Sequence, residues 1–388
     1  MTPIEDDGRG SGESSGPPSG GPTRLVRRSS FQVAFLGLLF LALFASHPPA
    51  DPDVFHRVAV GRLVEATGGV VDEDPFAFTE RHERWIDHEW LAGVVFYQAV
   101  RLWGDSGLLV VTLLTLLATV ALASRAQQVH QGGGAATFGW LLFTMVVAAR
   151  AWGSMARSQS FTFALLALQL LAVVQWRAGR RRWLWLLPLA YVPWANLHGG
   201  FVAGLGLLAT SAAAVTLARE RSSRDLWLCL GASALATLVN PWGVAFWRYI
   251  VTAVTMDRSN VPEWGALPLG SLWGVLALLL LAVFVAGAFR ARPRPPPEAW
   301  AVVLVAFAAA LSSRRLLSIF VLTVAVYGTP SARALLGPVV ARLPWGGRVP
   351  DPLRAAGLAV LAVTVGWQAA ARLAAFARDG LDFGRYPV

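Results

Sequence analysis

The chain has 388 residues, of which 55% are hydrophobic and only 14% are charged, with a mean hydropathy of +0.52. Soluble domains carry about 25% charged residues, so this composition excludes a water-soluble globular protein and predicts an integral membrane protein. All basic residues are arginines, and they lie in short clusters between apolar runs. The net charge of +10 is therefore interpreted as a signal that orients membrane helices, with no nucleic acid as partner.

The N-terminal segment, residues 1–28, is predicted to be a disordered cytoplasmic tail. Residues 8–22 are almost entirely Gly, Ser and Pro, which leaves no apolar surface to bury. A G-x-S-x-G match at Gly12–Gly16 has neither the strand nor the helix that a hydrolase elbow requires, so it is set aside. The remainder, residues 29–388, is predicted to form one transmembrane domain.

Eleven apolar runs follow, and we expect an all-α, polytopic protein of about eleven spans. Several runs are shorter than the roughly 20 residues of an ideal span, which predicts thin or tilted helices. With the N-terminus inside, the inner segments hold 19 Arg against 8 acids and the outer segments 14 Arg against 15 acids. This asymmetry agrees with the positive-inside rule. The predicted spans are 31–46, 107–124, 135–152, 159–176, 183–197, 200–218, 226–240, 271–289, 299–313, 316–329 and 355–371.

The segment 47–106 is the longest insertion and the most acidic part of the chain, and it is predicted to be an outer loop. One apolar periodicity begins near Val54 and a second begins at Trp90, which predicts two short amphipathic helices. Both are too short or too polar to span, and they suit the membrane interface. Gly68-Gly69 and Asp74-Pro75 break the chain between them.

Acidic residues of this loop are candidates for catalysis. Asp51 and Asp53 follow the first span at headgroup level, where a carboxylate can act as a general base or hold a divalent metal beside a phosphate. His56 can assist Asp53 or ligate a metal, although a lone histidine is more often structural. The acids at 72–74 are candidates for the same chemistry, but the interpretation that they only solubilise the loop is favoured.

A third acidic cluster ends with His88-Glu89. It begins like the zinc motif H-E-x-x-H, but Ala92 stands where the second histidine is required, so a zinc protease is excluded. Glu89 remains a candidate for substrate binding.

Polar residues also recur at the predicted outer ends of the spans. Arg157 and Arg314 lie where the positive-inside rule disfavours arginine, and guanidinium groups there can grip a phosphate. Asn196, His198 and Asn240 either line the same cleft or simply cap helix ends and form turns.

Four motifs carry a family resemblance: D-P-D-V-F-H-R, W-I-D-H-E-W-L, W-A-N-L-H-G-G-F and N-P-W-G. Their order, together with the large first outer loop, resembles the bacterial GT-C glycosyltransferase superfamily. That superfamily includes the protein O-mannosyltransferases and the lipid A aminoarabinose transferases, and the resemblance is strongest to the RgtA/B/C/D-like branch. It covers most of residues 30–388.

The resemblance implies a polyprenyl-phosphate-sugar donor, a lipid, glycan or protein acceptor, and transfer on the outer face of the bacterial plasma (inner) membrane. It gives the role of catalytic base to Asp53, with Asp51 as the alternative, because D-P-D replaces an adjacent acidic pair. A divalent metal is an open possibility. Two other readings stay open: a GT-C-like protein without catalytic activity, and a lipid or solute transporter, although no clear internal repeat supports the latter.

Overall fold

The computed structural model describes residues 53–77, 84–131, 135–152, 156–258 and 260–342, together with six single positions between 363 and 374. These residues form thirteen α-helices and three short 3-10 helices, and no strand occurs among them. The predicted tail, Asp51 and the first predicted span lie outside the described residues, as does most of the last predicted span.

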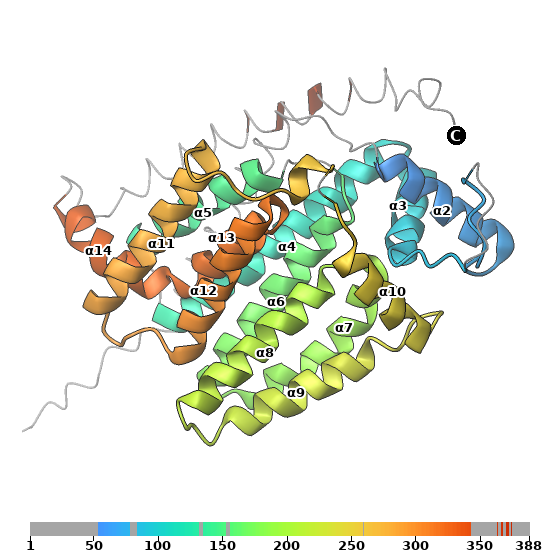
Figure 1. Ribbon diagram of the computed structural model, residues 1–388. Helices are drawn as coiled ribbons and strands as arrows, with labels where there is room; N and C mark the ends of the chain where they lie inside the picture. Colours follow the sequence, from blue (N-terminus) through green and yellow to red (C-terminus); the bar gives the residue numbers. More distant parts are fainter. Residues whose placement is uncertain are drawn as a thin grey trace, which may run out of the picture.

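The two helices expected in the first loop are present as α2 (Asp53–Thr67) and α3 (Trp90–Trp103), which pack against each other (Figure 1). Their backbones cross closely: a methyl group at Gly93 would lie 2.6 Å from the carbonyl oxygen of Arg57. Val54, Phe96 and other apolar side chains of this pair form a second, smaller core together with residues of later helices, among them Leu108 and Leu197. The loop is therefore a folded unit.

Three helices are long and apolar enough to cross a membrane: α4 (Ser106–Gln131), α6 (Gln159–Arg177) and α11 (Leu272–Arg290). A fourth candidate is the pair α13 (Leu317–Tyr327) and α14 (Thr329–Ala341), which bends by 65° at Gly328. The described part of the chain is thus an all-helical protein with three or four candidate spans, consistent with a helical membrane protein.

Most of the other predicted apolar runs also lie in helices of the described chain, but these helices are not among the candidate spans. The run 183–197 is divided between a 3-10 turn, η1 (Arg181–Trp185), and a short helix. A helix was also not expected at α10, in the segment after the run 226–240. The shorter helices are α5 (Ala135–Trp152), α7 (Leu186–Leu197), α8 (Phe201–Leu217), α9 (Ser223–Ala236), α10 (Val244–Thr255) and α12 (Pro297–Ser312).

Helix α13 lies at the centre of the bundle, and all of its residues are buried. It contacts α4, α5, α11 and α12, while α8 joins α12 to the α7 and α9 side (Figure 1). A helix that is apolar all round and buried all round requires neighbours on every side. The η3 turn (Arg314–Leu316) leads directly into α13, so its arginines are held by the most buried helix of the protein.

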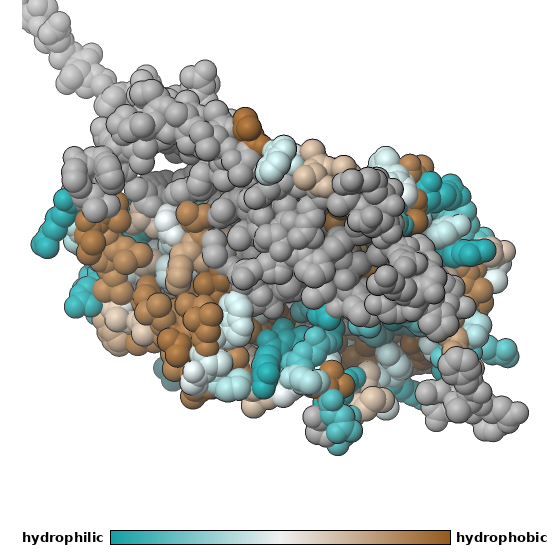
Figure 2. Space-filling model, turned by 90° about the horizontal axis from the view of Figure 1, so that it is seen from above, coloured by the Kyte–Doolittle hydropathy of each residue, from teal (hydrophilic) through white to brown (hydrophobic). Residues whose placement is uncertain are grey.

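The outward face of α11 is apolar. Leu272, Val275, Leu279 and Phe289 are all exposed, at 48–67% of their surface. Figure 2 shows apolar side chains gathered on the left-hand side of the molecule, where α11 and α14 lie in Figure 1. Soluble proteins rarely expose a continuous apolar patch of this kind, whereas lipid solvates it well.

Candidate functional site

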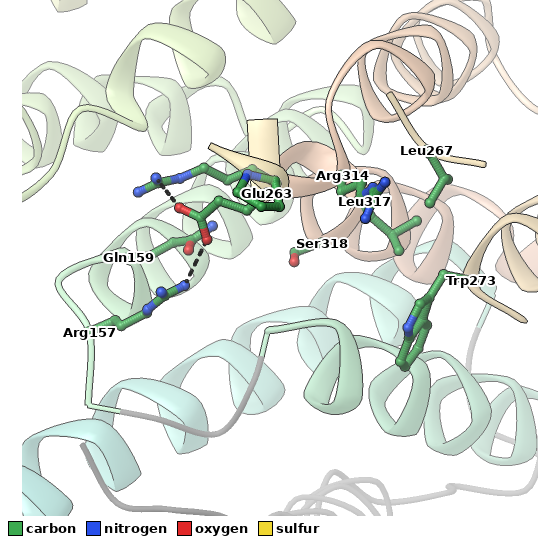
Figure 3. A pocket seen from close by; sticks show the side chains of 10 residues that line it. Arg157, Gln159, Glu263, Leu267, Trp273, Arg314, Leu317 and Ser318 are labelled. Carbon is green, nitrogen blue, oxygen red and sulfur yellow. Dashed lines mark hydrogen bonds and ion pairs between the residues drawn. The ribbon is translucent and has the colours of Figure 1, made fainter. Parts of the chain in front are cut away.

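A cavity of about 380 Å³ opens beside the start of α6, where η2 (Pro262–Trp264), η3 and the first turns of α11 and α13 meet (Figure 3). One part of its wall carries three guanidinium groups and one carboxylate. Another part is apolar. The lining residues are Arg157, Gln159, Pro262, Glu263, Leu267, Trp273, Arg314, Arg315, Leu317 and Ser318.

Glu263 bridges two of these arginines, as the dashed lines in Figure 3 show. Its Oε1 lies 2.8 Å from Nη1 of Arg315, and its Oε2 lies 3.4 Å from Nη1 of Arg157. All three side chains are partly exposed. Three guanidinium groups against one carboxylate leave the cavity with a formal charge of +2, which suits an anionic ligand.

Arg314 and Arg315 also contact the loop that leads into α11, as does the nearby Arg258. The Nε of Arg314 donates to the carbonyl oxygen of Ala266 at 3.1 Å. The guanidinium groups of Arg258 and Arg315 lie over the ring of Trp264, at 4.5 and 5.0 Å from its centroid. Arg157 and Arg314, the two arginines predicted from the sequence to bind phosphate, both line this cavity.

A buried polar network lies next to this cavity, centred on Glu89. Its Oε2 accepts a hydrogen bond from Ser158 at 2.6 Å, and Nε of Arg57 lies 3.5 Å away. The Nε2 atoms of His88 and His198 lie 3.5 and 3.7 Å from its Oε1. Because Ser158 directly follows Arg157 in the chain, Glu89 ties the first loop to one wall of the cavity.

Glu89 is held as a carboxylate. Burial alone would raise the pKa of its carboxyl group, but the two histidines, Arg57 and the Ser158 hydroxyl outweigh burial and lower the pKa to about 2. Arg57 supplies the permanent charge, and it also pairs with the buried Asp87. A carboxylate with so low a pKa is a weak base, so Glu89 positions other groups here and does not accept a proton.

His198 has a defined tautomer. Its Nδ1 accepts a hydrogen bond from the Gly200 backbone N–H at 2.9 Å, and the Thr162 hydroxyl lies 2.8 Å from the same atom. Burial lowers the pKa of His198 to about 4, so the imidazole is neutral at pH 7. The single ring proton is then on Nε2, facing Glu89.

This tautomer bears on the possible divalent metal. A protonated Nε2 has no lone pair for a metal, and the described residues offer no group of three His, Cys, Asp or Glu that could hold one. His56 lies apart, with its ring against the edges of Phe76 and Trp85. Burial lowers the pKa of His56. The donor set described here does not fit a metal centre.

Of the two glycines of W-A-N-L-H-G-G-F, close packing requires Gly200, and Gly199 lies near His88. A methyl group at Gly200 would overlap the Thr162 hydroxyl and lie 2.6 Å from its methyl carbon. At Gly199 a methyl group would lie 3.3 Å from the ring of His88. A side chain at position 200 would therefore displace Thr162, whose hydroxyl contacts His198.

The two asparagines have different surroundings. Asn196 accepts a hydrogen bond from Trp90 Nε1 at 2.9 Å and donates to the carbonyl oxygens of Val192 and Val239. It thereby joins α3 and α7 to the segment that follows α9. The Oδ1 of Asn240 instead accepts from the backbone N–H of Trp242, so Asn240 shapes its own turn. Neither asparagine lines the cavity.

Asp53 begins α2 and is exposed, outside the cavity lining. Its negative charge favours the protonated forms of His56 and Arg57, which lie one helical turn further along the same face. Arg57 in turn contacts Glu89.

Sequence reasoning did not single out Arg57, Ser158 or Arg315. Of these three, only Arg315 could have been found from the sequence, because it directly follows Arg314 at a predicted outer end of a span.

No protein-family model matches this chain, and no curated protein matches it. The arginine-lined cavity and the adjoining Glu89 network are therefore the features that bear on function.

Proposed function

We propose that this chain is a GT-C type membrane glycosyltransferase that moves a sugar from a polyprenyl-phosphate donor to an envelope acceptor on the outer face of the bacterial plasma membrane. The observation that carries the proposal is the two-sided cavity. Arg157, Arg314 and Arg315 line one part of it, and apolar side chains, among them Trp273, line another. A phosphate attached to an isoprenoid chain has the same division into an anionic and an apolar part.

In this proposal the arginines bind the phosphate of the donor and stabilise the charge that grows on it as the sugar leaves. Guanidinium groups suit this role because they remain charged and donate two parallel hydrogen bonds to phosphate oxygens. The acceptor oxygen bonds to the anomeric carbon, the bond from that carbon to the phosphate oxygen breaks, and the acceptor proton passes to a carboxylate. A single displacement of this kind inverts the anomeric carbon.

Asp53 is the proposed base, with Asp51 as the alternative. Asp53 is exposed at the start of α2, where an acceptor hydroxyl can reach it. The contact of Arg57 with Glu89, and of Glu89 with Ser158, fastens α2 to the region beside Arg157. The same proposal includes the eleven-span topology, a cavity that faces the outer side of the membrane, and a lipid, glycan or protein acceptor. No step uses a metal.

The test is transfer of a labelled sugar from polyprenyl-phosphate donors into membrane acceptors. Wild-type membranes are expected to incorporate label. Membranes that carry either Asp53→Asn or Arg157→Gln are expected to incorporate much less. Glu73→Gln, an exposed acid of the same loop, is the matched control and is expected to retain activity. Full activity of both Asp53→Asn and Asp51→Asn overturns the assignment of the base. Absence of transfer from any such donor overturns the function.

A further inference from the structure

Glu263 occupies the place in the cavity where an anionic ligand would meet two arginines. Each of its carboxylate oxygens faces a different guanidinium group, Oε1 toward Arg315 and Oε2 toward Arg157. A phosphate accepting hydrogen bonds from both arginines would put its oxygens in the same two positions. Glu263 and a phosphate therefore compete for the same donors.

Removing Glu263 from this position requires little rearrangement. Its side chain is 37% exposed, and exposed ion pairs contribute little to stability. The backbone just after it is fixed, because Gly265 O accepts from Arg314 N and Leu267 N donates to Leu311 O, both at 3.0 Å. The carboxylate can thus rotate away about its own side-chain bonds while the cavity keeps its shape.

We propose that Glu263 is a displaceable counter-ion, which neutralises Arg157 and Arg315 until a lipid monophosphate replaces it. The apolar lining at Leu267, Trp273 and Leu317 receives the first part of the lipid chain. The identity of that lipid as a polyprenyl phosphate rests on the proposed function. Competition by Glu263 ranks the ligands by charge: a doubly charged phosphate monoester, such as the polyprenyl phosphate that remains after sugar transfer, displaces it more readily than the singly charged phosphodiester of the intact donor.

The test is binding of farnesyl phosphate to the purified full-length chain in detergent at pH 8, where the phosphate is a dianion. Glu263→Gln removes the competing charge and is expected to tighten binding about fivefold, which corresponds to about 1 kcal/mol. Arg157→Gln is expected to weaken binding about tenfold or more. Glu65→Gln, which breaks an exposed ion pair with Arg101 on α2 and α3, is the matched control and leaves the affinity unchanged.

Unchanged or weaker binding by Glu263→Gln overturns the proposal, because it makes Glu263 a fixed part of the site. Farnesol and inorganic phosphate are the two further probes. If both bind more weakly than farnesyl phosphate, the ligand is a lipid phosphate. If inorganic phosphate binds as tightly as farnesyl phosphate, the proposal that the ligand carries a lipid chain is overturned. The sugar-transfer assay is independent: tighter binding by Glu263→Gln without any sugar transfer supports the counter-ion and rejects the transferase.

Discussion

The Nε2 atom of His198 lies 3.7 Å from the Oε1 atom of Glu89, although the two residues belong to distant parts of the chain. The Gly200 N–H fixes the tautomer of His198, so the proton on Nε2 faces the carboxylate. On its other side Glu89 accepts from Ser158. This one carboxylate therefore joins the first loop to the α7–α8 turn and to the start of α6.

Glu89→Gln is expected to lower the stability of the folded chain. The amide carries no charge, so Arg57 and the two histidines lose a buried carboxylate partner, at a cost of about 1–3 kcal/mol. The measurement is the apparent Tm in detergent at pH 7. Glu65→Gln, at an exposed pair, is expected to change stability by about 0.5 kcal/mol or less. Equal shifts for the two variants contradict a central role for Glu89.

The stability of the wild type is expected to fall as the pH drops from 6.5 to about 4. Burial lowers the pKa of His198 from 6.5 to about 4, so over this range the unfolded state binds a proton that the folded state does not. His198→Asn removes this titration and keeps an acceptor for Gly200 N–H. Its apparent Tm is expected to fall less between pH 7 and pH 4 than that of the wild type. Parallel pH profiles refute the assignment.

Gly200, which directly precedes α8, and Gly206, within α8, offer a pair of substitutions to compare. Gly200→Ala puts a methyl group against Thr162 and is expected to destabilise the chain by about 1–3 kcal/mol through overpacking. Gly206→Ala meets no atom within 4 Å and is expected to be neutral or stabilising, because alanine favours a helix. The two apparent Tm values decide this. An equal loss in both variants shows that the packing around Thr162 is not what requires Gly200.

The orientation of the first loop can be measured by cysteine labelling. In a Cys229→Ser background, Ala66→Cys at the exposed end of α2 is expected to react with a membrane-impermeant maleimide added to intact cells. Arg221→Cys, in the exposed turn between α8 and α9, is expected to react only after the membrane is permeabilised. The opposite pattern puts the cavity on the cytoplasmic side and rejects transfer at the outer face.

The apolar runs located several helices well because composition alone determines where a chain can remain in lipid. The runs 135–152, 159–176 and 271–289 differ from α5, α6 and α11 by at most one residue at either end. The run 316–329 corresponds to α13 alone, and the helix α14 that follows it at an angle of 65° was not predicted. Helix α14 is less apolar than α13 and contains Arg333, so apolar content did not mark it as the continuation of that helix.

The site was less accessible to sequence reasoning. Arg157 and Arg314 were selected because arginine is disfavoured outside, and both line the cavity. The bridge from Glu263 to Arg157 and Arg315 depends on how distant corners pack, which no local pattern encodes. Asn240 looked equivalent to Asn196, but only Asn196 bonds across helices. The assignment of Asp53 as the base remains a prediction.

The most direct test of the central claim is photo-crosslinking with a short polyprenyl phosphate that carries a diazirine on its first isoprene unit, followed by peptide mapping. The account predicts labelling of the apolar lining at Leu267, Trp273 or Leu317, and loss of this labelling in Arg157→Gln and Arg315→Gln. Labelling elsewhere on the chain, unaffected by either arginine substitution, contradicts the claim that this cavity binds a lipid phosphate.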